Sequence, residues 1–196
     1  MQNFSLPTFL FMFCAVLSFS QGEIISLEFE PSPIQPYGLL NPEAPPQVAD
    51  FAPIIGTCDC RSLARNADGS WQDTLAMVWR FKYIMNGTAV QDEVWRENNL
   101  YAGSIRQYQP DSAHWVVTYF SYPAVSIAPG VWHGNKIGDE IILYKPQKAP
   151  GGMEGKYKIT FYEIAETGFK WKGEWVNMDE SINYPTWYIA CRKRKE

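Results

Sequence analysis

Short runs rich in β-branched and aromatic residues fill the chain from Ile54 to the C-terminus, separated by clusters of Gly, Asn, Asp or Pro. No amphipathic helix pattern longer than two turns interrupts the series. Runs of this kind at close spacing are typical of antiparallel strands that pair in sequence order. We therefore predict about ten strands, near residues 54–65, 71–84, 89–97, 103–109, 114–122, 130–135, 139–145, 155–165, 168–176 and 184–192.

An up-and-down sheet of this size is expected to curl and close, because closure removes its exposed edges. The Asn86-Gly87 dipeptide indicates a hairpin, since a type I′ turn needs positive φ at both central residues. Asn86-Gly87-Thr88 is also a glycosylation sequon, but the turn explains it without modification. The sequence thus predicts an all-β fold, with an antiparallel up-and-down β-barrel over residues 54–196.

Alternation along several runs separates an aromatic face from a charged one. In "FKWKGEW", Phe169, Trp171 and Trp175 share one face, and Lys170 and Lys172 share the other. Successive side chains of a strand point to opposite sides of a sheet, so the charged face must be the solvent face. The inward set is large and aromatic, which fits either a ligand pocket or a filled core, and we favour the pocket.

The part of the chain before the strands divides in two. Residues 1–20 are predicted to be a signal peptide, because an apolar run from Phe9 to Val16 precedes small residues at a suitable cleavage site. That run is too short to span a bilayer, so no integral membrane domain is expected. Residues 21–53 are rich in proline, which disfavours helices and central strands, and are predicted to be an extended arm or linker. We expect an exported protein, periplasmic or secreted.

Composition narrows the classes of partner. Charged residues make up 19% of the chain and the formal net charge is -4, whereas a nucleic-acid binder would present a basic face. The single basic run, Arg192 to Lys195, is explained as a solvated tail. The histidines and cysteines lack metal-ligand spacing, and no nucleotide-binding motif is present. We therefore expect no metal, no cofactor and no nucleic acid, and the sequence gives no indication of oligomeric state.

Four blocks share an order of motifs with known proteins: "FAPIIGTCDCRSLARNADGSW", "MVWRFKYIMNGTAVQDEVW", "SIRQYQPDSAHWVVTYF" and "FKWKGEW". With this order the chain resembles, over residues 50–196, a family of bacterial lipocalin-like (calycin-like) proteins of unassigned function. The resemblance implies a barrel with a small-molecule cavity and implies no reaction. Cys58 departs from the pattern, since the family usually has Trp there. The matching residues are Gly56, Cys60, Trp79, Tyr83, Gly87, Gln91, Asp92, Arg106, Tyr108, Asp111, Trp115, Phe169 and Trp171.

Polar residues near the aromatic face are the candidates for a site. Arg106 and Tyr108 share a face, and an inward Arg106 would need a partner, because an unpaired buried charge is strongly unfavourable. Asp92 or Glu93, one strand away, could supply it. The alternatives are an ion pair that closes one barrel end and a guanidinium that binds a ligand carboxylate or carbonyl. The predicted ligand-binding set is Trp79, Tyr83, Gln91, Trp95, Arg106, Tyr108, Trp115, Phe169 and Trp171.

Three functions are open. The favoured one is an exported barrel that binds a small hydrophobic or aromatic ligand in its interior. The first alternative is a barrel enzyme of isomerase, cyclase or decarboxylase type acting on an apolar carboxylic acid, with Asp92 or Glu93 as acid/base and Arg106 and Tyr108 orienting the substrate. The second is a non-catalytic interaction module with a filled core. No catalytic residue is predicted outside the enzyme alternative.

The stretch "GTCDCRS" places Cys58 and Cys60 on one face of the first predicted strand. Residues two apart in a strand have Cα atoms about 6.6 Å apart, near the upper limit for a disulfide, so a bridge between them is disfavoured. A closed meander brings the first and last strands together, and in an oxidising compartment either cysteine could pair with Cys191. The family resemblance favours Cys60–Cys191, which leaves Cys58 as a buried thiol.

Overall fold

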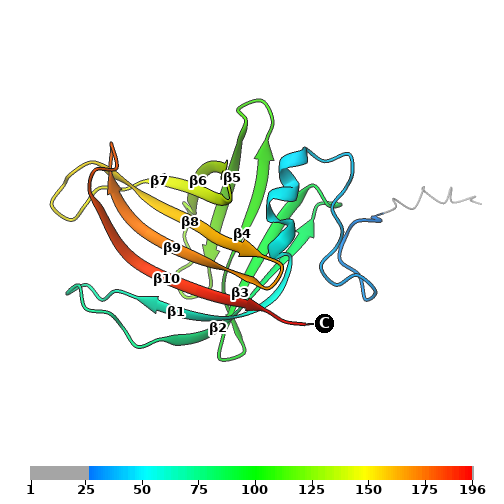
Figure 1. Cartoon of the computed structure of the whole chain (residues 1–196), viewed down its shortest axis with the longest axis horizontal. Helices are drawn as coiled ribbons and strands as arrows, with labels where there is room; N and C mark the ends of the chain where they lie inside the picture. The colour runs from blue at the N-terminus through cyan, green and yellow to red at the C-terminus, as the bar shows by residue number, and fades with distance from the viewer. Residues whose placement is uncertain (1–26, 196) are drawn as a thin grey trace, which may run out of the picture.

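The chain forms a closed barrel of ten antiparallel strands, seen in a computed structural model that describes residues 27–195 (Figure 1). Each strand pairs with its neighbours in sequence, and the last pairs with the first to close the ring. This order confirms the predicted up-and-down barrel. The predicted signal peptide lies outside the described residues. The strands are β1 (Gly56–Ala64), β2 (Leu75–Ile84), β3 (Ala89–Arg96), β4 (Asn99–Gln109), β5 (His114–Ser121), β6 (Gly130–Ile137), β7 (Glu140–Pro146), β8 (Gly155–Ala165), β9 (Gly168–Asn177) and β10 (Asn183–Lys193).

The strand boundaries differ most from prediction at the starts of β2 and β4, by four residues each: β2 begins at Leu75, after its predicted start at residue 71. β4 begins at Asn99, four residues before its predicted start, because Glu97 and Asn98 alone make the turn, both with positive φ. The predicted strands had left residues 98–102 as the loop. At the β2–β3 hairpin, Asn86 and Gly87 have φ values of 52° and 78°, which agrees with the predicted tight turn.

The predicted aromatic face lies inside the barrel. Trp79 and Phe81 on β2 and Phe169 and Trp171 on β9 are all less than a tenth exposed. Their rings meet one another and Phe161 of β8 across the interior, with most pairs edge-on or tilted. Such rings bury large apolar areas, and their contacts add to the stability beyond the area buried. The core of the barrel is therefore built from the residues that alternation had assigned to it.

One end of the barrel is closed by a 3-10 helix, η1 (Pro46–Ile54), drawn in cyan at the right-hand end of the barrel in Figure 1. Val48, Phe51 and Ile54 are at most 1% exposed. They are three residues apart, which places them on one face of a helix with three residues per turn. We call this helix the plug. The ring of Phe51 packs edge-on against Trp115 at 4.9 Å between centroids.

The plug differs from the predicted linker. Pro46 does not prevent this helix, because it stands in the first turn, where an N–H would have no partner within the helix. Pro53 lies inside the helix, next to its last residue.

The segment before the helix is hydrogen-bonded to the β2–β3 hairpin, where the backbone N–H of Asn41 donates to the Gly87 carbonyl at 3.2 Å. A Cβ on Gly87 would collide with the backbone of Leu39 and Asn41. The region before β1 is therefore attached to the barrel from Phe29 onward, where the Phe29 N–H donates to the Asn86 side chain at 3.1 Å.

Candidate functional site

The barrel interior contains a cavity of about 320 Å³. It lies between the plug and the opposite, open end of the barrel. This volume is near the lower end of the range for small-molecule sites, about 300–1,000 Å³. Its wall is mostly apolar and aromatic, with charged side chains at the floor and at the rim. The lining includes Met77, Trp79, Asp92, Val94, Arg96, Tyr101, Ala102, Ser104, Arg106, Tyr119, Trp132, Lys145, Tyr157, Ile159, Trp171 and Trp187.

The floor of the cavity is a buried ion pair between Asp92 of β3 and Arg106 of β4. Their side chains are 3% and 2% exposed. The Asp92 Oδ1 atom accepts hydrogen bonds from Arg106 and from the Ser104 hydroxyl, the latter at 2.5 Å. The Trp79 indole N–H donates to Oδ2 at 2.7 Å. Both carboxylate oxygens are thus engaged, so Asp92 is held by donors on three sides.

Aromatic rings surround the guanidinium of Arg106. Its central carbon lies 5.2 Å from the ring centre of Phe51 in the plug, 5.1 Å from Phe81 and 5.6 Å from Phe161. A cation near the faces of such rings is stabilised by their quadrupoles, more strongly when water is excluded. The plug, the ion pair and the core therefore form one continuous unit beneath the cavity.

The rim of the cavity carries two further cations, Arg96 at the end of β3 and Lys145 near the end of β7. The Arg96 guanidinium lies over the ring of Tyr101 at 4.1 Å. The Lys145 ammonium lies over the ring of Trp132 at 4.6 Å. Within residues 27–195, neither cation forms an ion pair with a carboxylate.

The predicted ligand-binding residues on the inner face divide into two groups. Trp79, Arg106 and Trp171 line the cavity. Tyr83, Trp115 and Phe169 are buried in the core but do not line it. Trp115 is instead held at the closed end, where its indole N–H donates to Asp50 at 3.1 Å.

The structure places the remaining predicted residues away from the cavity. On β3, Asp92 and Val94 face inward, so Gln91, Glu93 and Trp95 lie on the outer side. Polar and apolar residues occur on both faces of this strand, so its alternation did not decide the direction.

Glu93 forms salt bridges on the outer side with Arg80 at 2.7 Å and Lys82 at 3.2 Å. Trp95 stacks with the Arg80 guanidinium at 4.6 Å. Tyr108 lies at the closed end, edge-on to Trp115 at 5.7 Å. The enzyme alternative named Asp92 or Glu93 as acid/base and Tyr108 as an orienting residue. Of these, only Asp92 lies against Arg106.

Most residues at the rim of the cavity were absent from the predicted ligand-binding set. Tyr119, Tyr157 and Trp187 have the inward parity of their strands and could have been chosen on that signal. Tyr101 lies in a stretch that was not predicted as strand. Trp132 lies on a short strand flanked by glycines, where alternation is weak.

A second hollow of about 440 Å³ lies beside the β5–β6 loop and shares Tyr101, Ala102 and Tyr119 with the interior cavity.

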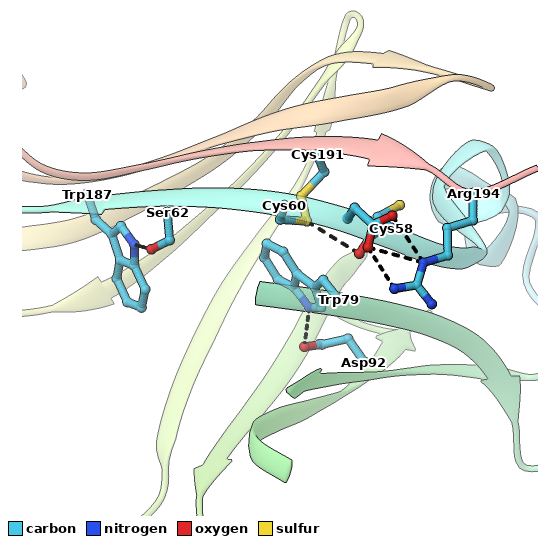
Figure 2. The surroundings of a disulfide bond; sticks show 9 residues. Cys58, Cys60, Ser62, Trp79, Asp92, Trp187, Cys191 and Arg194 are labelled. Atoms are coloured by element: carbon cyan, nitrogen blue, oxygen red, sulfur yellow. Dashed lines mark hydrogen bonds and ion pairs between the residues drawn. A yellow bond between two sulfur atoms is a disulfide. The ribbon is translucent and has the colours of Figure 1, made fainter. Parts of the chain in front are cut away.

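Cys60 and Cys191 are joined by a disulfide across the β1–β10 seam, as Figure 2 shows, with a Cα–Cα distance of 4.1 Å. The two residues are direct partners in the register of these strands. This geometry agrees with the pairing that the family resemblance favoured. Cys58 is a buried free thiol, and burial raises its pKa to about 11. The thiolate needed for nucleophilic or metal chemistry is therefore disfavoured at Cys58.

The chain was compared with models of protein families and with curated proteins, and nothing matched in either comparison. The closed ten-strand barrel itself is consistent with a calycin-like fold. Between Leu27 and Lys195, no group of three or more His, Cys, Asp or Glu is placed to hold a metal ion. No helix in that range is long and apolar enough to cross a membrane.

Proposed function

We propose that the protein binds a small hydrophobic or aromatic ligand inside its barrel. The observation that carries the proposal is the cavity of about 320 Å³ above the Asp92–Arg106 pair, walled by indole and phenol rings. Apolar concave sites with a few placed polar groups are the usual form of small-molecule sites. The plug closes one end, so a ligand would enter from the other.

The finer parts of this proposal rest on the sequence. The lipocalin-like family rests on the order of motifs over residues 50–196. Export rests on the signal-peptide pattern of residues 1–20, and the Cys60–Cys191 disulfide supports it, because such bonds persist mainly in oxidising compartments.

A binding role has more support than a catalytic one. Asp92 accepts three hydrogen bonds, from Trp79, Ser104 and Arg106, so both of its carboxylate oxygens are already engaged by the barrel and are not free to act on a substrate. Glu93, the other candidate acid/base, is paired on the outer surface.

The experiment is a fluorescence titration with a neutral apolar dye, N-phenyl-1-naphthylamine. Val94 lines the cavity, so Val94→Phe should fill part of it and weaken dye binding. The control is Val116→Phe, whose position on β5 has the opposite parity to the buried Trp115 and Val117. Equal dye binding by both variants would place the dye outside the barrel. Separately, native mass spectrometry of protein purified from its own host would identify a copurified ligand.

A further inference from the structure

Three residues that line the cavity carry buried N–H groups without a hydrogen-bond partner. Within residues 27–195, five buried side-chain N or O atoms have no hydrogen-bond partner, and three of them belong to cavity-lining residues. These three are Nε of Arg96, Nε of Arg106 and Nε1 of Trp132. All three are donors, because guanidinium and indole nitrogens carry hydrogen and do not accept. A buried donor without an acceptor is unfavourable, so a ligand oxygen that reaches one of these groups gains a hydrogen bond that the protein itself does not supply.

The charge of the lining has the same implication. The charged lining residues are Asp92, Arg96, Arg106 and Lys145, which sum to 3 − 1 = +2. Asp92 and Arg106 neutralise each other as an ion pair. The net positive charge therefore lies with Arg96 and Lys145 at the rim.

The phenols of the rim do not offset this charge. Burial raises the pKa of Tyr119 and of Tyr157, so both stay neutral at physiological pH. Cations partly removed from water and without a counter-ion attract an anion more strongly than exposed ones do.

The rim groups form a connected arc. Arg96 stacks on Tyr101 of β4, and Lys145 stacks on Trp132 of β6. Tyr119 of β5 lies between these pairs and packs edge-on to Trp132 at 6.0 Å. Below the arc, the wall is apolar and includes Trp171 and Ile159.

We propose that the interior ligand is an apolar carboxylic acid, held with its carboxylate at the rim and its apolar body in the barrel. Lys145 and Arg96 supply the positive charge, and the Trp132 N–H donates a hydrogen bond to a carboxylate oxygen. Arg106 remains engaged with Asp92 and is not the main anion site. This inference rests on the proposed function, since it specifies the ligand class of the same cavity.

The test compares three probes with the same chain and different head groups: decanoate, decanol and decylamine. Binding to the full chain is measured by isothermal titration calorimetry at pH 7.5. We expect decanoate to bind about tenfold more tightly than decanol, the usual size of one hydrogen bond to a charged group. Decylamine should bind more weakly than decanol.

Matched variants locate the head group. Lys145→Met keeps an unbranched side chain and removes the charge, and should reduce decanoate affinity about tenfold while leaving decanol affinity unchanged. Trp132→Phe should reduce decanoate affinity by a smaller factor. The control is Lys136→Met, which makes the same change in net charge at an exposed position near the other end of β6.

The outcomes separate the two proposals. If none of the three probes binds, the proposed function fails. If decanol binds as tightly as decanoate, or if Lys136→Met weakens decanoate as much as Lys145→Met does, the barrel binds apolar ligands but the rim anion site is wrong. Melting temperatures of the variants, measured alongside, show whether a lost affinity reflects a lost fold.

Discussion

Asp92 and Arg106 form an ion pair inside the barrel, from neighbouring strands and with almost no exposure of either side chain. Removing one member of such a pair leaves an uncompensated buried charge, whereas exposed pairs contribute little. This one contact therefore joins the stability of the barrel to the floor of its cavity.

Arg106→Met should lower the free energy of unfolding by about 3–5 kcal/mol, because Asp92 would remain buried without its counter-ion. The matched control is Arg80→Met, which breaks the outer pair with Glu93, where Arg80 is 38% exposed. That change should cost no more than about 1 kcal/mol. Urea denaturation measures the free energy of unfolding of both variants. Similar losses would show that the interior pair contributes no more to stability than the outer pair.

Phe51→Ala should destabilise the protein by about 3–5 kcal/mol, the usual range for a buried Phe. Phe51 is fully buried, and it contacts Trp115, Phe161 and the Arg106 guanidinium. Phe120→Ala is the control, since Phe120 is 42% exposed. Thermal melting gives the comparison. A Phe51→Ala protein as stable as the control would mean that the plug is not part of the folded core.

The Cys60–Cys191 disulfide can be tested by mapping the cysteines with mass spectrometry. Proteolysis of the non-reduced protein should release the Cys60 and Cys191 peptides as one linked species, and Cys58 should react with iodoacetamide only after unfolding. Cys191→Ser should lower stability by about 2–5 kcal/mol. The difference from the parent should shrink in a reducing buffer, because the parent then loses the same bond. A persistent difference would point to packing at position 191.

Glu180 should contribute to stability in a pH-dependent way. Partial burial would raise its pKa, but hydrogen bonds from Lys158, Tyr144 and Lys156 outweigh this and lower it from 4.5 to about 2. A lowered carboxyl pKa stabilises the folded state above the unfolded value of 4.5, and this contribution disappears as the pH falls toward 2.

Glu180→Gln should therefore be less stable than the parent at pH 7, and the gap should narrow between about pH 4.5 and pH 2. Urea midpoints at pH 7, 4 and 3 provide the measurement. Glu154→Gln is the control, since Glu154 pairs with Lys148 at a site where both are 65% exposed. A gap that widens in acid would contradict the assignment.

The alternation of apolar and charged residues predicted the inner face of most strands, because inward and outward residues differ clearly on strands such as β2 and β9. It failed on β3, where Gln91 and Asp92 are both polar and only the pairing with β4 decides which faces inward. The plug was missed because its prolines concealed the three-residue spacing of Val48, Phe51 and Ile54. The rim was missed because Arg96 and Lys145 become neighbours of one cavity only through barrel closure.

The Cys60–Cys191 bond also changes what a break in the chain can do. Together with the backbone between them, the two cysteines form a covalent ring with a sequence separation of 131 residues. Every hairpin loop of the barrel lies within this ring. A single protease nick in any of these loops would open the ring but leave the two fragments attached, so the cleaved strands would stay within reach of their partners.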